Sequence, residues 1–387
     1  MFSILLLVII YISFISLGLP DSLLGAAWPS MYSTLNVPMH YAGFISMVIT
    51  GATVVSAVFS EKVIRRFGTG IVTAVSVLTT AVSLIGFSIS NSIYMLCFFA
   101  VPLGLGAGSV DAGLNNYVAL HHKARHMSWL HCFWGIGTTI GPLIMASFLL
   151  NMNSWNMGYR TIGLMQFCLV VILFISLPLW KKPVENSVKS ESVKFSKLFS
   201  ITGVKEVLTA FFLYCSIEMT SGLWGASYLV MERGFPPEIA AQWTALFFFG
   251  ITAGRFITGF ITIKLNNRRI IRLGQAIIGC AVIIIVLPFE NFALAGLFMI
   301  GLGCAPIFPC LIHETPVSFG REYSQAIIGL QMACAYIGTS VMPPLFGWIA
   351  SYLSFSIFPV FIGIILLLQI TAVETLNWKI KKKSREQ

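Results

Sequence analysis

The chain has 387 residues, of which 57% are hydrophobic and only 10% are charged, and its mean hydropathy is +0.87. Soluble domains carry about 25% charged residues, so this composition excludes an ordinary soluble domain and indicates a membrane protein that crosses the bilayer many times. The formal net charge of +10 could suggest a nucleic-acid partner, but the positions of the basic residues along the chain indicate another origin.

Twelve apolar runs are long enough to cross a bilayer, which takes about 20 residues. The first run has no basic segment before it and no small-residue cleavage site before Pro20, so it is not a signal peptide. Because backbone groups in lipid must be paired within each helix, we expect an all-α membrane protein with twelve transmembrane helices, surrounded by membrane lipid. The runs begin near residues 4, 41, 70, 92, 128, 160, 206, 240, 271, 292, 325 and 355.

The basic residues alternate between the two ends of these spans. If the N-terminus is cytoplasmic, all but three of the 24 Lys and Arg residues fall in inner turns, the central linker or the C-terminal tail. The exceptions are Arg160 and Arg233 on the other side and Arg255 inside a span. This asymmetry follows the positive-inside rule. It predicts a multi-pass protein of the plasma (cytoplasmic) membrane with both termini cytoplasmic, and it removes the reason to expect a nucleic-acid partner.

The polar stretch KKPVENSVKSESVKFSKLFS divides the chain after six spans. Segments of the two halves resemble each other at an offset of about 200 residues, for example CFWGIGTTIGPLIM from Cys132 and ACAYIGTSVMPPLFG from Ala333. The pattern predicts two pseudo-symmetric six-helix bundles in parallel repeat, an arrangement that places a substrate site near the bilayer midplane between the halves. The expected parts are an N-terminal bundle (1–180), a cytoplasmic linker (181–205), a C-terminal bundle (206–378) and a basic cytoplasmic tail (379–387).

Three acidic residues lie well inside predicted spans: Asp21, Asp111 and Glu218. An ionised side chain at the bilayer centre costs roughly 2.5–3.5 kcal/mol on insertion scales. Each of these acids is therefore expected to face the bundle interior or a wet cavity. A carboxylate in a poorly hydrated cavity takes up a proton more readily, so all three are candidates for proton coupling.

The fourth span carries Gly104, Gly108, Asp111 and Asn115 on one helical face. Glycines allow a neighbouring backbone or a ligand to come close, and a carboxylate beside an amide can hydrogen-bond a polyol such as a sugar. Asn115 and the adjacent Asn116 are candidate substrate ligands, although Asn116 points away from the Asp111 face. The structural alternative is that Asp111 only hydrogen-bonds a neighbouring helix.

Asp21 follows Pro20, which removes one backbone hydrogen bond and bends the first span. Asp21 is thus expected beside a kink, either as a functional acid or as a helix cap. In the seventh span, Glu218 and Ser221 share a face, with Trp224 next to it. Polar groups beside an aromatic ring suit a sugar, so Glu218 and Trp224 are candidate substrate ligands.

Further polar residues lie inside spans. Arg255 is the only basic residue deep in a span, and its expected partner is an acid of the same bundle or a nearby carbonyl group, in a gating or structural role. His131 and Trp134, one turn apart in the fifth span, are candidate substrate ligands, and His131 could instead shuttle protons or cap the helix end. Gln331, a buried amide in the eleventh span, is also a candidate substrate ligand.

Four segments together resemble one family: GLGAGSVDAGLNNYVA, LPDSLLGAAWP, YCSIEMTSGLWG and AGRFITGF. They are similar to spans 4, 1, 7 and 8 of the fucose:proton symporter family of the major facilitator superfamily, the third and fourth in its glucose-transporting branches. The resemblance implies sugar:proton symport, with Asp111 and Asp21 as the proton and substrate carboxylates and a monosaccharide as the small-molecule substrate. The chain departs from the family at span 4, where Asp111 stands in place of the expected glutamate.

Two further motifs bear on gating and on a rival function. SEKVIRRFGTG keeps only Arg66 and Gly68 of the superfamily's inner-turn motif G-x-x-x-D-R-x-G-R-[KR], so these two residues are gating or structural candidates. GIGTTIGP ends at Pro142 and contains G-x-x-x-G-P, which resembles the span-5 motif of drug:proton antiporters, although it is also a plain helix-packing pattern. The alternative function is therefore a proton-coupled antiporter that exports drugs or metabolites.

The sequence argues against other classes of protein. It has no G-x-x-x-x-G-K-[ST] loop, so ATP-driven pumping is not expected, and it has no evident metal cluster or nucleophile–base pair, so an enzyme is not expected. The eight cysteines fall within predicted spans without C-x-x-C spacing and are interpreted as buried free thiols. We expect no metal and no cofactor, a proton as coupling ion with sodium still open, and a monomer.

Overall fold

The structure is a computed structural model that describes residues 2–121, 124–180, 195–261 and 265–386. These residues form helices and no strand. They divide into two compact units, the first comprising Met1–Ser187 with Gly225–Phe248 and the second comprising Val188–Trp224 with Phe249–Gln387. The expected linker lies largely in residues 181–194, outside the described part, and the domain boundaries drawn from the sequence stay a prediction.

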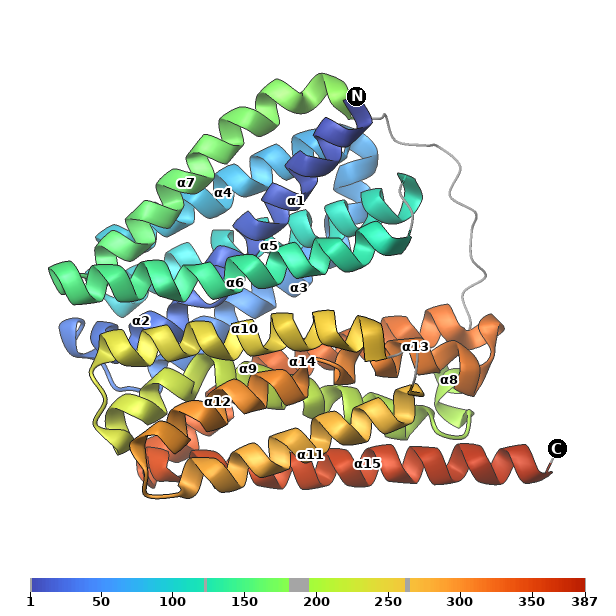
Figure 1. Cartoon of the computed structure of the whole chain (residues 1–387). Helices are drawn as coiled ribbons and strands as arrows, with labels where there is room; N and C mark the ends of the chain where they lie inside the picture. The colour runs from blue at the N-terminus through green and yellow to red at the C-terminus, as the bar shows by residue number, and fades with distance from the viewer. Residues whose placement is uncertain (1, 122–123, 181–194, 262–264, 387) are drawn as a thin grey trace. The chain divides into compact units, whose positions relative to one another are not determined.

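The helices up to residue 180 belong to the first unit, and two long helices, α9 and α10, contribute to both (Figure 1). The helices before residue 180 are α1 (Phe2–Asp21), α2 (Leu23–Thr34), α3 (Tyr41–Phe67), α4 (Thr69–Ile89), α5 (Ile93–His121), α6 (Ala124–Met152), α7 (Trp155–Ser176) and the 3-10 turn η1 (Leu177–Leu179). The later helices are α8 (Phe195–Ser200), α9 (Val204–Arg233), α10 (Pro237–Ile261), α11 (Asn267–Val286), α12 (Glu290–Cys304), α13 (Ile307–Phe319), α14 (Arg321–Tyr352), the 3-10 turn η2 (Phe355–Ile357) and α15 (Phe358–Glu386).

Twelve stretches of these helices are long and apolar enough to cross a membrane, as the sequence predicts. Their first residues lie close to the predicted starts, and the largest difference is at the sixth span, expected near residue 160 and observed from Trp155. The apolar runs can be read from the sequence because span length depends on local composition and on the bilayer thickness.

Two of the twelve spans are each built from two α-helices. The first span is broken at Ser22, between α1 and α2, directly after the Pro20–Asp21 pair. Pro20 lies inside α1, and the helix ends one residue later, so the interruption of the first span falls beside the proline, where the sequence predicts a bend. The tenth span is broken between α12 and α13, where Pro306 precedes the first residue of α13.

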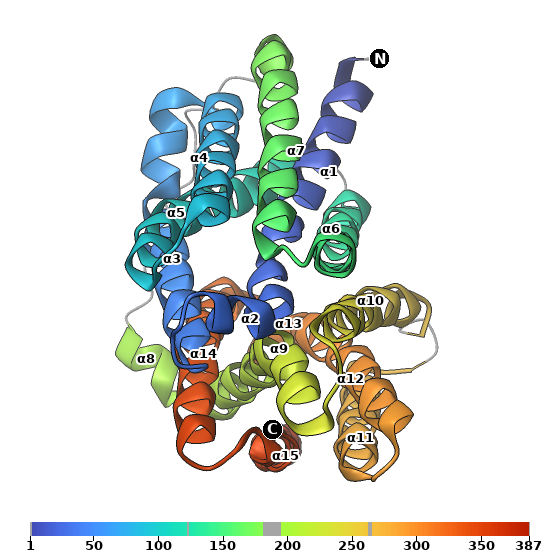
Figure 2. The ribbon, with the colours of Figure 1, turned by 90° about the vertical axis from the view of Figure 1, so that its left-hand side faces the viewer.

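The core of the first unit lies between α1, α4, α5, α6 and α7. Phe14 of α1, Leu114 of α5, Leu130 of α6 and Leu173 of α7 are fully or almost fully buried in one hydrophobic cluster. Figures 1 and 2 show α1 beside α6 and α7. This arrangement places the end of α1, with its acidic residue, against the middle of α6.

Glycines allow two helix pairs of this unit to pack backbone to backbone. A Cβ atom at Gly104 or Gly108 of α5 would collide with the carbonyl oxygen of Ile49 or Thr53 in α3. The glycine stripe of the fourth span therefore accommodates a neighbouring backbone, one of the two uses expected of it. Glycines of α6 likewise allow close packing against the backbone of α1.

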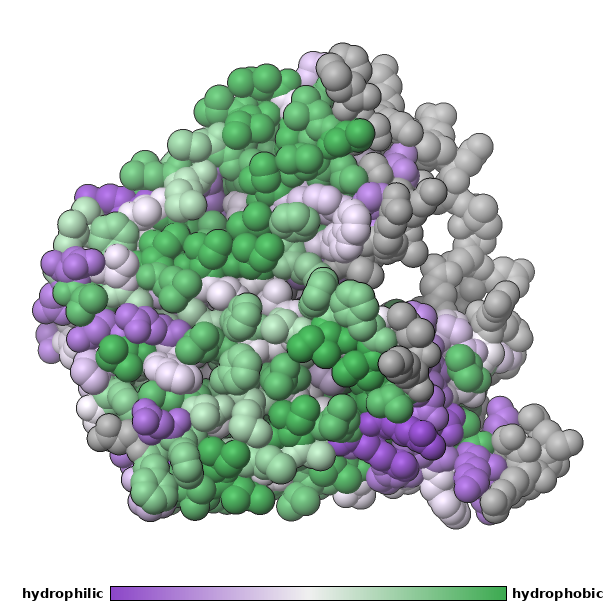
Figure 3. Space-filling view, viewed as in Figure 1, coloured by the Kyte–Doolittle hydropathy of each residue, from purple (hydrophilic) through white to green (hydrophobic). Residues whose placement is uncertain are grey.

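The outer surface suits a lipid environment. Figure 3 shows that apolar residues dominate the face drawn, over helices of both units, while hydrophilic residues gather near the ends of helices. In the second unit, hydrophilic residues lie near the right-hand ends of α11 and α15 in this view. Apolar side chains of many helices are exposed, including Phe98, Ile175, Phe256 and Leu367, as expected where lipid replaces water as the solvent.

The C-terminal helix continues beyond the length that a bilayer requires. α15 has 29 residues, which corresponds to about 43 Å at 1.5 Å per residue, whereas the hydrocarbon core is about 30 Å thick. The basic segment expected as a tail from residue 379 is therefore mostly the last turns of this helix. Lys379 fixes it to α9 through an ion pair with Glu206, with 2.5 Å between Nζ and Oε1.

Candidate functional site

Asp21 lies at the last residue of α1, where the first span breaks. Its carboxylate oxygen Oδ2 accepts a hydrogen bond from the indole Nε1 of Trp134 in α6, at 2.8 Å. Asp21 is exposed and Trp134 is half-buried. The broken helix thus presents an accessible carboxylate whose bonded side-chain partner is an uncharged donor.

Asp111 and Asn115 form the second polar pair of the first unit. They lie one turn apart on α5, and the Asn115 amide donates to Asp111 Oδ1 at 2.8 Å and to the Asp111 backbone oxygen at 3.0 Å. Both residues are half-buried. The helical spacing in the sequence predicts this pairing, and again the group bonded to the carboxylate is neutral.

Asp21 and Asp111 lie on α1 and α5, two helices that contact each other within the first unit. Each carboxylate receives its hydrogen bond from a neutral group. Each can therefore take up a proton and can present hydrogen-bonding oxygens to a polar solute.

Two other predicted ligands of the first unit do not bond to these acids in the structure. His131 is exposed on α6, and its ring meets the ring of Phe14 edge to face, with centroids 5.9 Å apart. Asn116 is exposed on α5, one position away from the Asp111 face. His131 lies one turn before Trp134 and can belong to the same site, whereas Asn116 points elsewhere and we leave it out of the proposed site.

The buried acid of the second unit has different partners. Glu218 of α9 pairs with Arg255 of α10, with 3.5 Å between Oε1 and Nη2, and the two side chains are only 11% and 20% exposed. The hydroxyl of Tyr214 donates to the other carboxylate oxygen. The pair gives Arg255 the acid of the same bundle that the sequence predicts. Tyr214 was not predicted, although its position one turn before Glu218 on the same helix could have indicated it.

Trp224 and Gln331, two predicted substrate ligands, contact other core residues of the second unit. Trp224 is fully buried among aromatic rings, including that of Phe346, and its indole donates to the Pro343 carbonyl of α14 at 2.8 Å. Gln331 is also fully buried and accepts a hydrogen bond from Thr315 of α13 at 3.0 Å. The ring of Trp224 and the amide of Gln331 are thus enclosed in the core in this structure, and their roles as substrate ligands stay predictions.

The gating and structural candidates lie at turns and inside a helix. Gly68 joins α3 to α4 with φ +83°, a conformation that favours glycine. Arg66 is exposed two residues earlier, and its guanidinium lies 5.4 Å from the ring centroid of Phe67. Pro142 is buried within α6. Their parts in a gate stay predictions.

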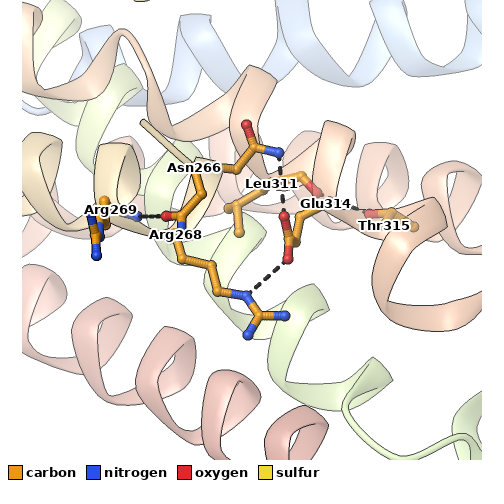
Figure 4. Close-up of polar contacts among 7 residues, drawn as sticks. Asn266, Arg268, Arg269, Leu311, Glu314 and Thr315 are labelled. Atoms are coloured by element: carbon orange, nitrogen blue, oxygen red, sulfur yellow. Dashed lines mark hydrogen bonds and ion pairs between the residues drawn. The ribbon is translucent and has the colours of Figure 1, made fainter. Parts of the chain in front are cut away.

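Ion pairs join the helix ends of the second unit. Figure 4 shows Glu314 of α13 accepting hydrogen bonds from the start of α11, where Arg268 Nε lies 2.9 Å from Oε1. Further along α11, Arg272 binds Glu374 of α15 through two hydrogen bonds of 2.7 and 2.6 Å. These ion pairs link α11 to its neighbours α13 and α15. Among the described residues, no three His, Cys, Asp or Glu side chains come together as a metal site.

Comparison with known proteins gives the family context. The family model described as Major Facilitator Superfamily matches residues 10–312 and 207–386. The chain is 24% identical over 365 residues to the glucose/mannose transporter GlcP of Bacillus subtilis (strain 168), covering 87% of this chain and 86% of that protein.

Two other relatives match at similar length. One is the bypass of stop codon protein 6 of Saccharomyces cerevisiae (strain ATCC 204508 / S288c), 22% identical over 418 residues, covering 96% of this chain and 81% of that protein. The other is the cis,cis-muconate transport protein of Acinetobacter baylyi (strain ATCC 33305 / BD413 / ADP1), 22% identical over 355 residues, covering 85% of this chain and 83% of that protein.

A solved structure shares the fold. It is a bacterial homologue of the human lysosomal transporter Spinster, crystallised in an inward-facing and unoccupied conformation. The TM-score is 0.73 at 10% sequence identity, and the match covers 98% of this chain and 96% of that one. At this identity the likeness concerns the fold alone.

Proposed function

Because the chain belongs to the Major Facilitator Superfamily, we propose that this multi-pass membrane transporter moves a sugar or a similar small polar solute together with protons, by alternating access. One observation supports this proposal most strongly: the two acids of the first unit, Asp21 and Asp111, are bonded to the uncharged donors Trp134 and Asn115. The chain is accordingly a carrier and not an enzyme.

Neutral partners suit a carboxylate that gains and loses a proton. The indole N–H of Trp134 and the amide of Asn115 orient each carboxylate without cancelling its charge. Moving an uncompensated charge through a dry region is costly, so the acid must be protonated before the cavity closes. This requirement couples proton uptake to the conformational step.

The same residues can recognise a sugar. Hydroxyl groups donate to carboxylate and amide oxygens and accept from N–H groups. The Asn115 amide adds an acceptor beside Asp111, and the Trp134 ring adds an aromatic face beside Asp21. The exposed His131 imidazole, one helical turn before Trp134, adds a further polar group. A relative named as a glucose/mannose transporter supports a monosaccharide as the first substrate to test.

The transport cycle follows from these properties. With the cavity open to the outside, Asp21 or Asp111 takes up a proton and the sugar binds beside it. The neutral site closes, the cavity opens to the cytoplasm, and the sugar and the proton leave. An inside-negative potential favours this direction by about 2.3 kcal/mol per charge per 100 mV. The Lys and Arg asymmetry supports placing both termini in the cytoplasm and the protein in the cytoplasmic membrane.

The alternative is a proton-coupled antiporter that exports drugs or metabolites. Its support is the G-x-x-x-G-P motif that ends at Pro142. In the structure, Gly137 and Gly141 of this motif touch the backbone of α1, where a Cβ atom would collide with the Ile15 and Leu19 carbonyl oxygens. Helix packing therefore accounts for the motif, and symport remains the better-supported proposal.

The test is the external pH of a weakly buffered, de-energised suspension of expressing cells during addition of glucose, mannose and other monosaccharides. Symport predicts that the medium becomes alkaline with one of these sugars and that Asp111→Asn abolishes the change. A repeat in sodium-free buffer separates proton coupling from sodium coupling. The double variant Glu218→Gln with Arg255→Met, which removes a buried acid together with its arginine and leaves no unpaired charge, is the matched control.

Two results would contradict the proposal. Absence of any pH change with every sugar, in cells that contain the protein in the membrane, would exclude sugar:proton symport. Proton entry linked to the efflux of an apolar dye would instead establish the antiport alternative.

A further inference from the structure

Pro20, at the bend of α1, leaves one backbone carbonyl oxygen without its helical hydrogen-bond donor. In an α-helix the N–H of residue 20 would bond the carbonyl oxygen of residue 16, but Pro20 has no N–H. In the structure, the side-chain amide of Gln166, from α7, donates to the Ser16 oxygen at 2.8 Å. A side chain of another helix thus replaces the backbone bond that the proline removes.

Gln166 is itself held in place. Its amide oxygen accepts a hydrogen bond of 2.8 Å from the hydroxyl of Thr80, in α4. Gln166 and Thr80 are only 2% and 4% exposed. Because a buried amide without partners is costly, this orientation of Gln166 is strongly preferred, and the bend of α1 is tied to both α7 and α4.

A small cavity adjoins this junction. Ser16, Pro20, Thr80 and Gln166 are among the residues that line it, and it has room for about one water molecule. The Ser16 hydroxyl is buried and has no hydrogen-bond partner among the described residues. A water molecule in this cavity would supply that partner.

The opposite side of the bend is fixed by α6. A Cβ atom at Gly18 would collide with the Trp134 backbone oxygen, and the glycines of α6 touch α1 in the same way. Trp134 belongs to the helix that packs here and bonds Asp21. Figure 2 shows the end of α1 beside α6 and α7. The direction of the Asp21 side chain is therefore set by the bend of α1 and by the helices that hold this bend, which are α4, α6 and α7.

We propose that Gln166 is a positioning residue. It replaces the backbone hydrogen bond lost at Pro20, and a buried water molecule binds the Ser16 hydroxyl beside it. Gln166 thereby holds the bend that directs Asp21 toward Trp134. Gln166 does not contact the solute. The inference rests on the proposed role of Asp21 for its functional meaning, whereas the structural link between Gln166 and Pro20 can be tested without any transport.

The first test is a double-mutant cycle on the full chain in detergent, with thermal stability as the readout. Gln166→Met removes the amide at similar side-chain volume and is expected to lower the melting temperature. In a Pro20→Ala background, residue 20 can supply the missing N–H, so the same change should cause a smaller loss. Equal losses in the two backgrounds would overturn the link between Gln166 and the bend.

The second test measures the environment of Asp21 directly. A carbodiimide reacts with protonated carboxyl groups, and mass spectrometry gives the extent of reaction at Asp21 across a pH series in the purified protein. Gln166→Met is expected to shift the midpoint of this reaction, by about one pH unit if the bond to Trp134 is lost.

The matched control is Gln275→Met, which removes a buried amide of α11, in the second unit, that donates to Gln369 at 2.7 Å. It should lower stability and leave the Asp21 midpoint unchanged. If Gln166→Met also left the midpoint of the Asp21 reaction unchanged, Gln166 would be only a packing residue and the proposal would be overturned. Because neither test uses a sugar, failure of the proposed symport function would be seen separately, in the cell-suspension experiment.

Discussion

The acids inside the spans of the two units have different partners. In the first, Asp21 and Asp111 receive hydrogen bonds from neutral groups, an indole and an amide. In the second, Glu218 faces the guanidinium of Arg255 and the hydroxyl of Tyr214. All three acids satisfy the same sequence criterion, an acid deep in an apolar span, yet their partners give them different chemistry.

The hydrogen-bond partners of each acid indicate which acid is suited to exchange a proton. A carboxylate paired with arginine is compensated without a proton, and removing one partner of such a pair leaves a buried charge. A carboxylate with neutral partners has only a proton to neutralise it. We therefore expect proton coupling at Asp21 and Asp111 and a structural role for the Glu218–Arg255 pair, which joins α9 to α10, although the sequence predicts all three acids as coupling candidates.

The largest expected effect is on coupling in the first unit. Asp21→Asn and Asp111→Asn should reduce proton-coupled net uptake to background, because an amide cannot release a proton. Exchange of labelled for unlabelled sugar should persist, since it needs no net proton movement. Glu218→Gln should retain pH-dependent uptake. If Glu218→Gln alone uncoupled transport, the contrast between the units would be reversed.

The next largest effect concerns the stability of the second unit. Arg255→Met leaves Glu218 as an uncompensated, mostly buried charge and should destabilise the protein by about 3 kcal/mol. The double variant with Glu218→Gln should recover much of that loss, because the unpaired charge is gone. Thermal unfolding in detergent measures both. Similar losses in the single and double variants would show that the pair contributes little.

A smaller and more selective effect separates two tryptophans. Trp134→Phe removes a hydrogen bond to a carboxylate, which is worth about 1.5–3 kcal/mol, and should lower the uptake rate about tenfold. Trp224→Phe removes a bond to a backbone carbonyl in the core and should lower stability by about 1 kcal/mol with unchanged pH dependence of uptake. If instead Trp224→Phe lowered the uptake rate and Trp134→Phe lowered only the stability, the transport site would lie in the second unit.

The smallest effect is expected at the helix ends. Arg272 and Glu374 form a doubly hydrogen-bonded pair, but their side chains are 56% and 41% exposed. Exposed pairs contribute at most about 1 kcal/mol, so Arg272→Ala should change the melting temperature only slightly and leave uptake unaffected. A large loss of stability would mean that this pair, and not the buried Glu218–Arg255 pair, dominates the charge interactions of the second unit.

Much of the fold follows from the sequence, because span positions depend on local composition. The twelve spans, the bend at Pro20 and the acid partner of Arg255 are each predicted by residue type and spacing. The pairing of Asp111 with Asn115 is predicted for the same reason, since both lie on one helix and its periodicity fixes their contact.

The parts that were not predicted depend on which neighbour packs against a helix. Trp224 lies in the core because α14 carries the Pro343 carbonyl that accepts its indole hydrogen bond, and the sequence does not show this partner. Gln166 resembles Gln331 in sequence, a lone amide in an apolar span, and only the structure shows that its partner is the carbonyl freed by Pro20. Hydropathy alone cannot rank such residues, since it carries no information about the facing helix.

The length of α15 has a practical consequence. About 13 Å of this helix exceeds the hydrocarbon thickness, and the Lys379–Glu206 pair ties the beginning of this extension to α9. The extension acts as a rigid lever, so a change of about 10° in the tilt of α15 would move its tip by about 2 Å relative to the membrane surface. A fluorophore placed near Lys383 would report rotation of the second unit without a label inside the transport path.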